Sequence, residues 1–180
     1  MKHFESADEY ITALRKKPRK YAIIPKSLAG KALGLSRAGI TKQVETGKLA
    51  EVGVSGRRYL LARGVANSLE NERRLTERIR KILEDLAGDG RTITYGKLMG
   101  SVEMSSQRPP DRDKIGKILG RISKATHDES RIMLSVLVVR KHDSLPSPPF
   151  FSLAKKLGFR WSSDSRFVEK HTELVWSKYQ

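Results

Sequence analysis

The segment from Gly64 to Leu86 constrains the fold of this chain most strongly. Its apolar residues recur at steps of three and four, which is the spacing of one helix face, and the opposite positions are mostly charged. These apolar residues are Val65, Leu69, Leu75, Ile79, Ile82, Leu83 and Leu86. The pattern predicts one long amphipathic helix, ended by Gly-Asp-Gly at 88–90. Such a helix packs across a domain or pairs with a copy of itself, and its repeat is too short and irregular to require a coiled coil.

The charge of the chain is divided around this helix. Of the formal net charge of +16, residues 1–63 carry +9, residues 64–90 carry −1 and residues 91–180 carry +8. A length of 180 residues is enough for two small domains with modest cores. We therefore predict an α+β fold with two basic modules, 1–63 and 91–180, joined by a linking helix over 64–90.

Several protein classes are disfavoured by composition. The chain has no cysteine, which excludes disulfides, thiolate nucleophiles and cysteine-ligated zinc. No stretch approaches the roughly 18–20 apolar residues of a membrane span, and residues 1–10 lack the apolar segment of a signal peptide. We expect a soluble cytoplasmic protein with no membrane partner. Its positive charge attracts polyanions, which leaves nucleic acid, acidic lipid and acidic protein open as partners.

Residues 1–63 contain a glycine-punctuated pattern of short helices and strands. A first helix is predicted over 5–17, followed by a short β run that ends at Pro25. Ser27 is expected to cap a short helix that ends at Gly34, where a positive φ is easily adopted. Ser36 is expected to cap a second helix over 37–46, with Ile40 and Val44 facing inward and Gly47 ending it. Strands over 48–54 and 57–61 follow, joined by a tight turn at 55–56.

This order of elements is what a helix needs in order to read duplex DNA. The helix must be short, must carry small or polar side chains, and must be braced by a preceding helix across a tight turn. Arginine and glutamine can make paired hydrogen bonds to base edges, and threonine can contact a thymine methyl group. The predicted contacts of this module with double-stranded DNA are Ser27, Lys31, Ser36, Arg37, Thr41, Lys42, Gln43, Lys48, Arg57 and Arg58.

The stretch from Ser27 to Leu61 resembles the small winged-helix domain of excisionases and MerR-type regulators. The matching positions are Ala32, Leu33, Gly34, Ser36, Ile40, Val44, Gly47, Leu49 and Gly56-Arg57. The resemblance covers about a fifth of the chain and implies DNA binding through the helix from Ser36 to Thr46 and through the following hairpin, the wing. The alternative is a small helical subdomain whose charges are only solvated.

Residues 91–180 are predicted to form a mixed module. Thr94 is expected to cap a helix over 95–99, a loop over 108–113 precedes a basic amphipathic helix over 113–126, and residues 131–139 read as a strand buried on both faces. A proline-rich loop over 141–150, a short helix ending at Gly158 and a last helix over 164–178 complete it. On that last helix, one packed face is expected to hold Phe167, Val168, His171, Leu174 and Val175.

This module has a weaker likeness to the DNA-binding domain of O6-alkylguanine alkyltransferases. Thr94, Tyr95, Gly96, Leu98, Ile115, Gly116 and Leu119 fit that layout. The acceptor cysteine of that family would fall near Val138, and the chain has none, so alkyl transfer is excluded. The likeness still implies a second helix-turn-helix, with Lys114, Lys117, Arg121 and Lys124 facing phosphate. An oligomerisation domain is the alternative role.

A magnesium-dependent nuclease is the enzymatic alternative, because acidic residues and histidines flank the strand predicted over 131–139. The candidates are Glu103, Asp111, Asp113, His127, Asp128, Glu129, Lys141, His142 and Asp143. They show no recognised ligand spacing, and acidic residues at turns are common turn formers. His171 and the aromatic residues Phe150, Phe151, Phe159 and Trp161 are interpreted as core residues, although the aromatic cluster could also stack on unpaired bases.

We therefore predict a sequence-specific double-stranded DNA-binding protein with no catalytic residue, metal or cofactor. The expected role is a transcriptional regulator or repressor of bacterial, phage or plasmid type that acts as a homodimer at the nucleoid. A DNA-binding adaptor in plasmid maintenance or phage defence is the remaining alternative, because the sequence does not separate it from a regulator.

Overall fold

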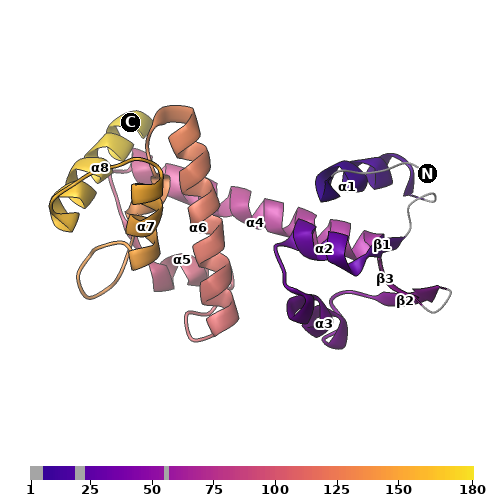
Figure 1. Ribbon diagram of the computed structural model, residues 1–180. Coiled ribbons are helices and arrows are strands. Elements are labelled where there is room, and N and C mark those ends of the chain that lie inside the picture. Colours follow the sequence, from indigo (N-terminus) through magenta and orange to yellow (C-terminus); the bar gives the residue numbers. More distant parts are fainter. Residues whose placement is uncertain (1–5, 19–22, 55–56) are drawn as a thin grey trace. The chain divides into compact units, whose positions relative to one another are not determined.

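The computed structural model describes residues 6–18, 23–54 and 57–180 of the chain. Helices dominate, with small sheets beside them, so the fold is a helix-rich α+β fold (Figure 1). Contacts within the chain divide it into two compact units, residues 1–74 and residues 75–180, called unit 1 and unit 2 below. Among the described residues, no helix combines the length and the apolar character that crossing a membrane requires.

Unit 1 places three helices and a three-stranded sheet before the start of a long helix. The elements in chain order are α1 (Ala7–Lys16), β1 (Ile23–Pro25), α2 (Lys26–Leu33), α3 (Arg37–Glu45), β2 (Glu51–Val54) and β3 (Arg57–Leu61). The sheet is antiparallel in the order β1-β3-β2, with Ile24 opposite Leu60 and Val52 opposite Tyr59. These elements follow the sequence prediction closely, although the turn at 55–56 lies outside the described residues.

The core of unit 1 collects apolar residues from α1, α2, α3, β1, β3 and the start of α4. Its buried members are Ile11, Leu14, Ile24, Ala29, Ile40, Leu49, Leu60, Ala62 and Val65. The predicted inward positions on α3 are confirmed, because Ile40 is 1% exposed and Val44 packs against the same core. Burial of this apolar surface is the main stabilising term for a unit of this size.

The predicted cap at Ser27 is wrong. Helix α2 begins at Lys26, and the N-cap position lies two residues earlier than predicted, at Pro25, with φ −59° and ψ 140°. Because proline fixes φ near this value and ends β1, the chain enters the helix directly from the strand. Ser27 therefore lies exposed in the first turn of α2, where its backbone N–H has no partner within the helix.

The long helix predicted over 64–86 is confirmed as α4 (Ala62–Gly88). Its first turns pack in unit 1 through Ala62 and Val65, and its later turns pack in unit 2 through Ile79, Leu83 and Ala87. The single apolar stripe read from the sequence thus serves two cores. Gly90 ends the segment with a positive φ of 65°.

Unit 2 continues from α4 through four further helices and a two-stranded parallel sheet. The elements are β4 (Ile93–Thr94), α5 (Tyr95–Ser101), α6 (Pro109–Ser130), a 3₁₀ helix (Leu134–Leu137), β5 (Val138–Val139), α7 (Pro148–Lys156) and α8 (Asp164–Tyr179). Ile93 lies opposite Val138 in the sheet. The predicted cap of α5 is confirmed, because the Thr94 hydroxyl accepts from the Lys97 N–H at 3.4 Å.

Two predicted loops contain prolines that instead begin helices, while residues 141–147 of the second loop lie outside helices and strands as predicted. Pro109 and Pro110 begin α6, and Pro148 and Pro149 begin α7. Proline lacks a backbone N–H, but the first-turn N–H groups of a helix have no helical acceptor, so the loss costs nothing there. The rule that proline breaks helices applies to helix interiors and fails at these positions.

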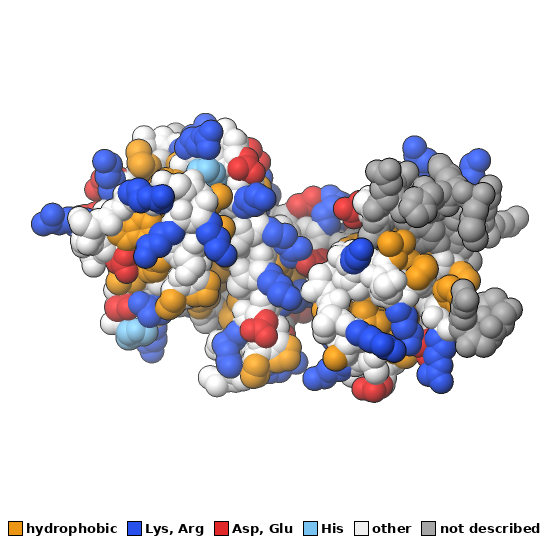
Figure 2. All heavy atoms as spheres, viewed as in Figure 1, with side chains coloured by type: hydrophobic (Ala, Val, Ile, Leu, Met, Phe, Trp, Pro, Cys, Tyr) orange, Lys and Arg blue, Asp and Glu red, His pale blue; other side chains and the backbone are white. Residues whose placement is uncertain are grey.

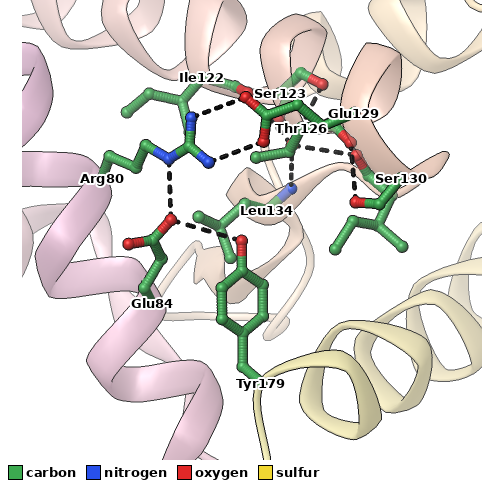
Figure 3. Close-up of polar contacts among 10 residues, drawn as sticks. Arg80, Glu84, Ile122, Ser123, Thr126, Glu129, Ser130, Leu134 and Tyr179 are labelled. Atoms are coloured by element: carbon green, nitrogen blue, oxygen red, sulfur yellow. Dashed lines mark hydrogen bonds and ion pairs between the residues drawn. The ribbon is translucent and has the colours of Figure 1, made fainter.

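Residues 132–139 are buried as predicted and Arg131 is exposed, but most of the segment does not form a strand. Three successive N–H groups are bound by side chains: Met133 donates to His171 Nε2 (2.8 Å), Leu134 to Thr126 Oγ1 (3.2 Å) and Ser135 to Ser123 Oγ (3.3 Å). Figure 3 shows the Thr126–Leu134 bond. Because these three N–H groups are bonded to side chains, they are not available for hydrogen bonds between strands. Only Val138 and Val139 pair with another strand, as β5.

A polar network ties α4 to α6 and to the end of α8 (Figure 3). The Arg80 guanidinium donates to both carboxylate oxygens of Glu129, at 3.0 and 2.7 Å, and to Glu84 at 2.8 Å. The Tyr179 hydroxyl donates to the same Glu84 oxygen at 3.4 Å. The Arg80 partner holds the pKa of Glu129 below its usual range. Two hydrogen bonds between one guanidinium and one carboxylate, as in the Arg80–Glu129 pair, fix α4 against α6 more precisely than a single contact does.

Candidate nucleic-acid interface

The junction between α2 and α3 is tightly built. Gly34 has φ +61°, and the Leu35 N–H donates to the Gly30 carbonyl at 2.9 Å. A Cβ atom on Gly30 would lie 2.9 Å from the Leu35 carbonyl oxygen, closer than real Cβ contacts allow. Glycine at 30 and 34 therefore permits the sharp turn and the close approach that set the direction of α3.

Helix α3 is anchored at its start and on its inner face. The Ser36 side chain accepts from the Gly39 N–H at 3.2 Å, which confirms the predicted cap. Ile40 and Val44 face the core. On the outer side, Arg37, Thr41 and Lys42 are exposed, and Gln43 is half-buried. The predicted contact residues of α3 thus lie outside the unit 1 core, on a helix whose position is fixed by packing.

The surface around α2 and α3 is strongly basic. Within residues 26–48 the cations are Lys26, Lys31, Arg37, Lys42 and Lys48, and Glu45 is the single carboxylate. Neither helix has an acidic residue in its first turn. Figure 2 shows Lys and Arg side chains over the region of α3. Since helix N-termini also carry partial positive charge, this part of the protein presents an anion-attracting surface.

The five predicted contacts outside α3 and its cap lie on α2, on the segment between α3 and β2, and on β3. Ser27 and Lys31 are four residues apart on α2 and both are exposed, so they share one helix side. Lys48 is exposed directly after the turn at Gly47, whose φ is +71°. Arg58 lies on β3 opposite Gly53, with its side chain 75% exposed. Gly56 and the side chain of Arg57 lie outside the described part of the structure.

One acidic residue in this surface was not identified from the sequence. Glu51 on β2 forms an ion pair with Lys26 on α2 and a second, at 3.4 Å, with Arg58 on β3. The bond from Lys26, with help from Arg58, lowers the pKa of Glu51 below its usual range. Lys26 and Glu51 are 25 positions apart in the sequence, so no local sequence signal predicts their ion pair. The ion pair with Glu51 restrains the Arg58 side chain on the hairpin, while most of that side chain stays exposed to solvent.

In unit 2, the predicted basic residues lie on the outer face of α6. Lys114, Lys117, Arg121 and Lys124 are exposed, while Ile115, Ile118, Leu119 and Ile122 are buried in the core. The spacing of three and four residues aligns the four cations along one side of the helix. This confirms the amphipathic pattern, although such a face is also the ordinary solvent side of a helix.

The acidic residues considered for nuclease chemistry are dispersed or engaged. Asp111 accepts from the Ser105 N–H at 2.9 Å and pairs with Arg108, Glu129 pairs with Arg80, and Asp143 pairs with Arg140. Within the described ranges, no group of three or more His, Asp or Glu side chains is arranged to hold a metal ion. The aromatic residues pack as expected, with Phe150 buried and Phe159 against the ring of buried His171.

The predicted packed face of α8 is wrong at one position. Leu174 is 50% exposed, whereas Val168, His171, Thr172 and Val175 are buried. Positions 168, 171, 172 and 175 follow the three- and four-residue steps of one helix side, and 174 falls beside that stripe. Thr172, although polar, lies on the buried side.

The comparisons with known proteins add no relative. No protein family, curated protein or solved structure matches this chain. The resemblances described above therefore stay interpretations of the residues that carry them.

Proposed function

We propose that this protein binds double-stranded DNA in a sequence-specific manner through a winged helix-turn-helix formed by α2, α3 and the β2–β3 hairpin. The observation that carries the proposal is the outer face of α3, where Arg37, Thr41 and Lys42 are exposed on a helix fixed by a cap and a buried isoleucine. A short helix braced in this way suits the major groove.

The chemistry of each side chain gives it a role in this proposal. Arg37 and Lys42 can hydrogen-bond to a guanine edge, and Gln43 can form two hydrogen bonds to adenine. The Thr41 hydroxyl donates to the Arg37 carbonyl at 3.1 Å, and its methyl group can contact thymine. Ser27, Lys31, Ser36 and Lys48 flank α3 and are assigned to phosphates, as is the hairpin with Arg57 and Arg58.

The biological role we propose is regulation of transcription as a homodimer at the nucleoid. One short helix reads few base pairs, so proteins of this kind gain discrimination by binding two half-sites. The outer face of α6, with Lys114, Lys117 and Arg121, is proposed as a second phosphate-binding surface. A DNA-binding adaptor without a promoter would use the same contacts, and the position of the selected sites relative to promoters separates the two roles.

The first test replaces the base-reading side chains. After the preferred duplex has been selected from a random pool, Arg37→Ala and Lys42→Ala should each weaken binding to it by about tenfold to a hundredfold. Binding to unrelated duplexes should change much less, because only the selected sequence supplies the matched base edges. Lys81→Ala, which removes an equal charge from an exposed position of α4, is the control and should leave the affinity unchanged. Unchanged affinity of both α3 variants for the selected duplex would refute the assignment of α3.

The second test addresses the hairpin. Replacing Arg57 and Arg58 together by alanine should weaken binding to selected and unrelated duplexes by similar factors, because phosphate contacts carry no sequence information. The slope of log affinity against log salt should fall by about one for each lost phosphate contact. Titrations at several salt concentrations measure this slope. A loss confined to the selected sequence would show that the hairpin reads bases instead.

A further inference from the structure

A surface pocket of unit 2 has a composition that the duplex-binding proposal does not use. The pocket has a volume of about 350 Å³ and is lined by Lys155, Phe159, Arg160 and Trp161, at the end of α7 and in the segment before α8. Figure 2 shows hydrophobic side chains with Lys and Arg side chains around them in the region of α7 and α8. Two aromatic rings and two cations thus meet at one opening.

Trp161 is held as a fixed wall of this pocket. One face of its indole stacks on Phe167, with ring centroids 4.3 Å apart and planes 13° from parallel. The indole N–H donates to Asp164 at 2.6 Å, which fixes the ring in its own plane. The Lys155 ammonium lies over the indole, 5.6 Å from the ring centre. The indole is therefore positioned before any ligand arrives.

The cations of the pocket are placed to receive an anion beside this ring. Lys155 and Arg160 are both exposed, and Arg160 is steadied because its guanidinium donates to the Phe159 carbonyl at 3.0 Å. Asp164, the nearest carboxylate in sequence, is engaged by the indole N–H. This arrangement matches a ligand that carries both a planar aromatic ring and a nearby negative charge. A nucleotide has both, in its base and its phosphate.

We propose that the pocket binds an unpaired nucleotide of single-stranded DNA. The base stacks on the indole face of Trp161 that is turned away from Phe167, where it displaces the Lys155 ammonium, and Lys155 and Arg160 then bind the adjoining phosphates. A paired base inside a duplex cannot use this pocket, because both of its faces are covered by neighbouring bases. The proposal is separate from the α3 interface and does not depend on it, since the residues involved belong to different units.

The test compares two probes of equal charge. A labelled thymidine oligonucleotide of about eight residues and an abasic oligomer of the same length are titrated against the full chain at about 200 mM salt, where non-specific phosphate binding is weakened. The wild-type protein should prefer the thymidine probe by about tenfold or more, because only that probe can stack. In Trp161→Ala this preference should fall towards one, with circular dichroism confirming that the variant is folded.

A charge-matched pair of variants keeps the proposal testable if Trp161→Ala does not fold. Lys155→Gln with Arg160→Gln should weaken thymidine binding about tenfold, whereas Lys156→Gln with Arg166→Gln, equally exposed and outside the pocket lining, should have little effect. Equal effects of the two pairs, or equal affinity of the wild-type protein for both probes, would overturn the proposal. So would binding of thymidine monophosphate as tight as that of the oligonucleotide. Lys81→Ala, at an exposed position of α4 outside both proposed sites, should leave the thymidine titration unchanged.

Discussion

Lowering the pH from 7 to 5 is expected to reduce the free energy of unfolding of unit 2 by about 2 kcal/mol through His171 alone. This side chain is 2% exposed on α8, and its Nε2 atom accepts the Met133 N–H at 2.8 Å. Burial, together with the charge of neighbouring His127, lowers the pKa of His171 to about 4 from a usual value of 6.5. Protonation would place a second donor against the Met133 N–H, so the folded state resists it.

The sign of the effect follows from which state binds the proton. Between pH 6.5 and about pH 4, His171 is mostly protonated in the unfolded chain and mostly neutral in the folded chain. The contribution of His171 to the free energy of unfolding is therefore fully present above pH 6.5 and is lost as the pH falls between these two values. The ion-paired carboxylates of unit 2 act at lower pH. Arg80 holds the pKa of Glu129 below its usual value of 4.5, so the stability that this pair contributes is lost only as the pH falls below that value. Between pH 7 and 5 the change in the free energy of unfolding therefore comes mainly from histidine.

Urea titrations at pH 7 and 5, followed by tryptophan fluorescence, measure this difference, because both tryptophans of the chain lie in unit 2. His171→Gln keeps an acceptor for the Met133 N–H and does not titrate, so its stability should vary about 2 kcal/mol less over this interval than that of the wild-type protein. His142→Gln is the matched control, since that side chain is 72% exposed. Equal pH dependence in wild type and His171→Gln would contradict the prediction.

The second large effect is expected from Thr126→Val. The Thr126 hydroxyl accepts the Leu134 N–H at 3.2 Å and lies 3.0 Å from the Ile132 carbonyl, both within a fully buried segment (Figure 3). Valine has nearly the same shape but removes the acceptor of the Leu134 N–H and the one hydroxyl hydrogen, which lies within reach of the Ile122, Ser123 and Ile132 carbonyls. The expected loss is about 3 kcal/mol, because each unsatisfied buried polar group costs roughly 1–3 kcal/mol.

The conservative variant separates hydrogen bonding from packing. Thr126→Ser keeps the hydroxyl and removes one methyl group, so it should cost only about 1 kcal/mol. Urea denaturation at pH 7 measures both variants on the same footing. If valine were tolerated as well as serine, the hydroxyl would not be holding residues 132–135 in place, and their conformation would need another explanation.

Much of unit 1 could be predicted because its signals are local. The positive φ at Gly34, the cap at Ser36 and the inward Ile40 each depend on residues within four positions along the chain. The ion pairs of Glu51 with Lys26 and Arg58 could not be predicted, because they form only after the sheet brings α2 beside β2. The sequence therefore predicted the course of α3 and its cap, whereas the ion pairs of the hairpin depended on residues brought together by the fold.

What the sequence alone determined is the placement of the helices, since apolar residues at steps of three and four on α4 and α6 require one buried face wherever that face packs. What only the tertiary structure decided is the conformation of residues 131–139. Their apolar, β-branched composition favours a strand, but His171 on α8 and Thr126 and Ser123 on α6 bind three consecutive N–H groups. A backbone donor bonded to a distant side chain cannot join a sheet, so partners remote in sequence override the local preference.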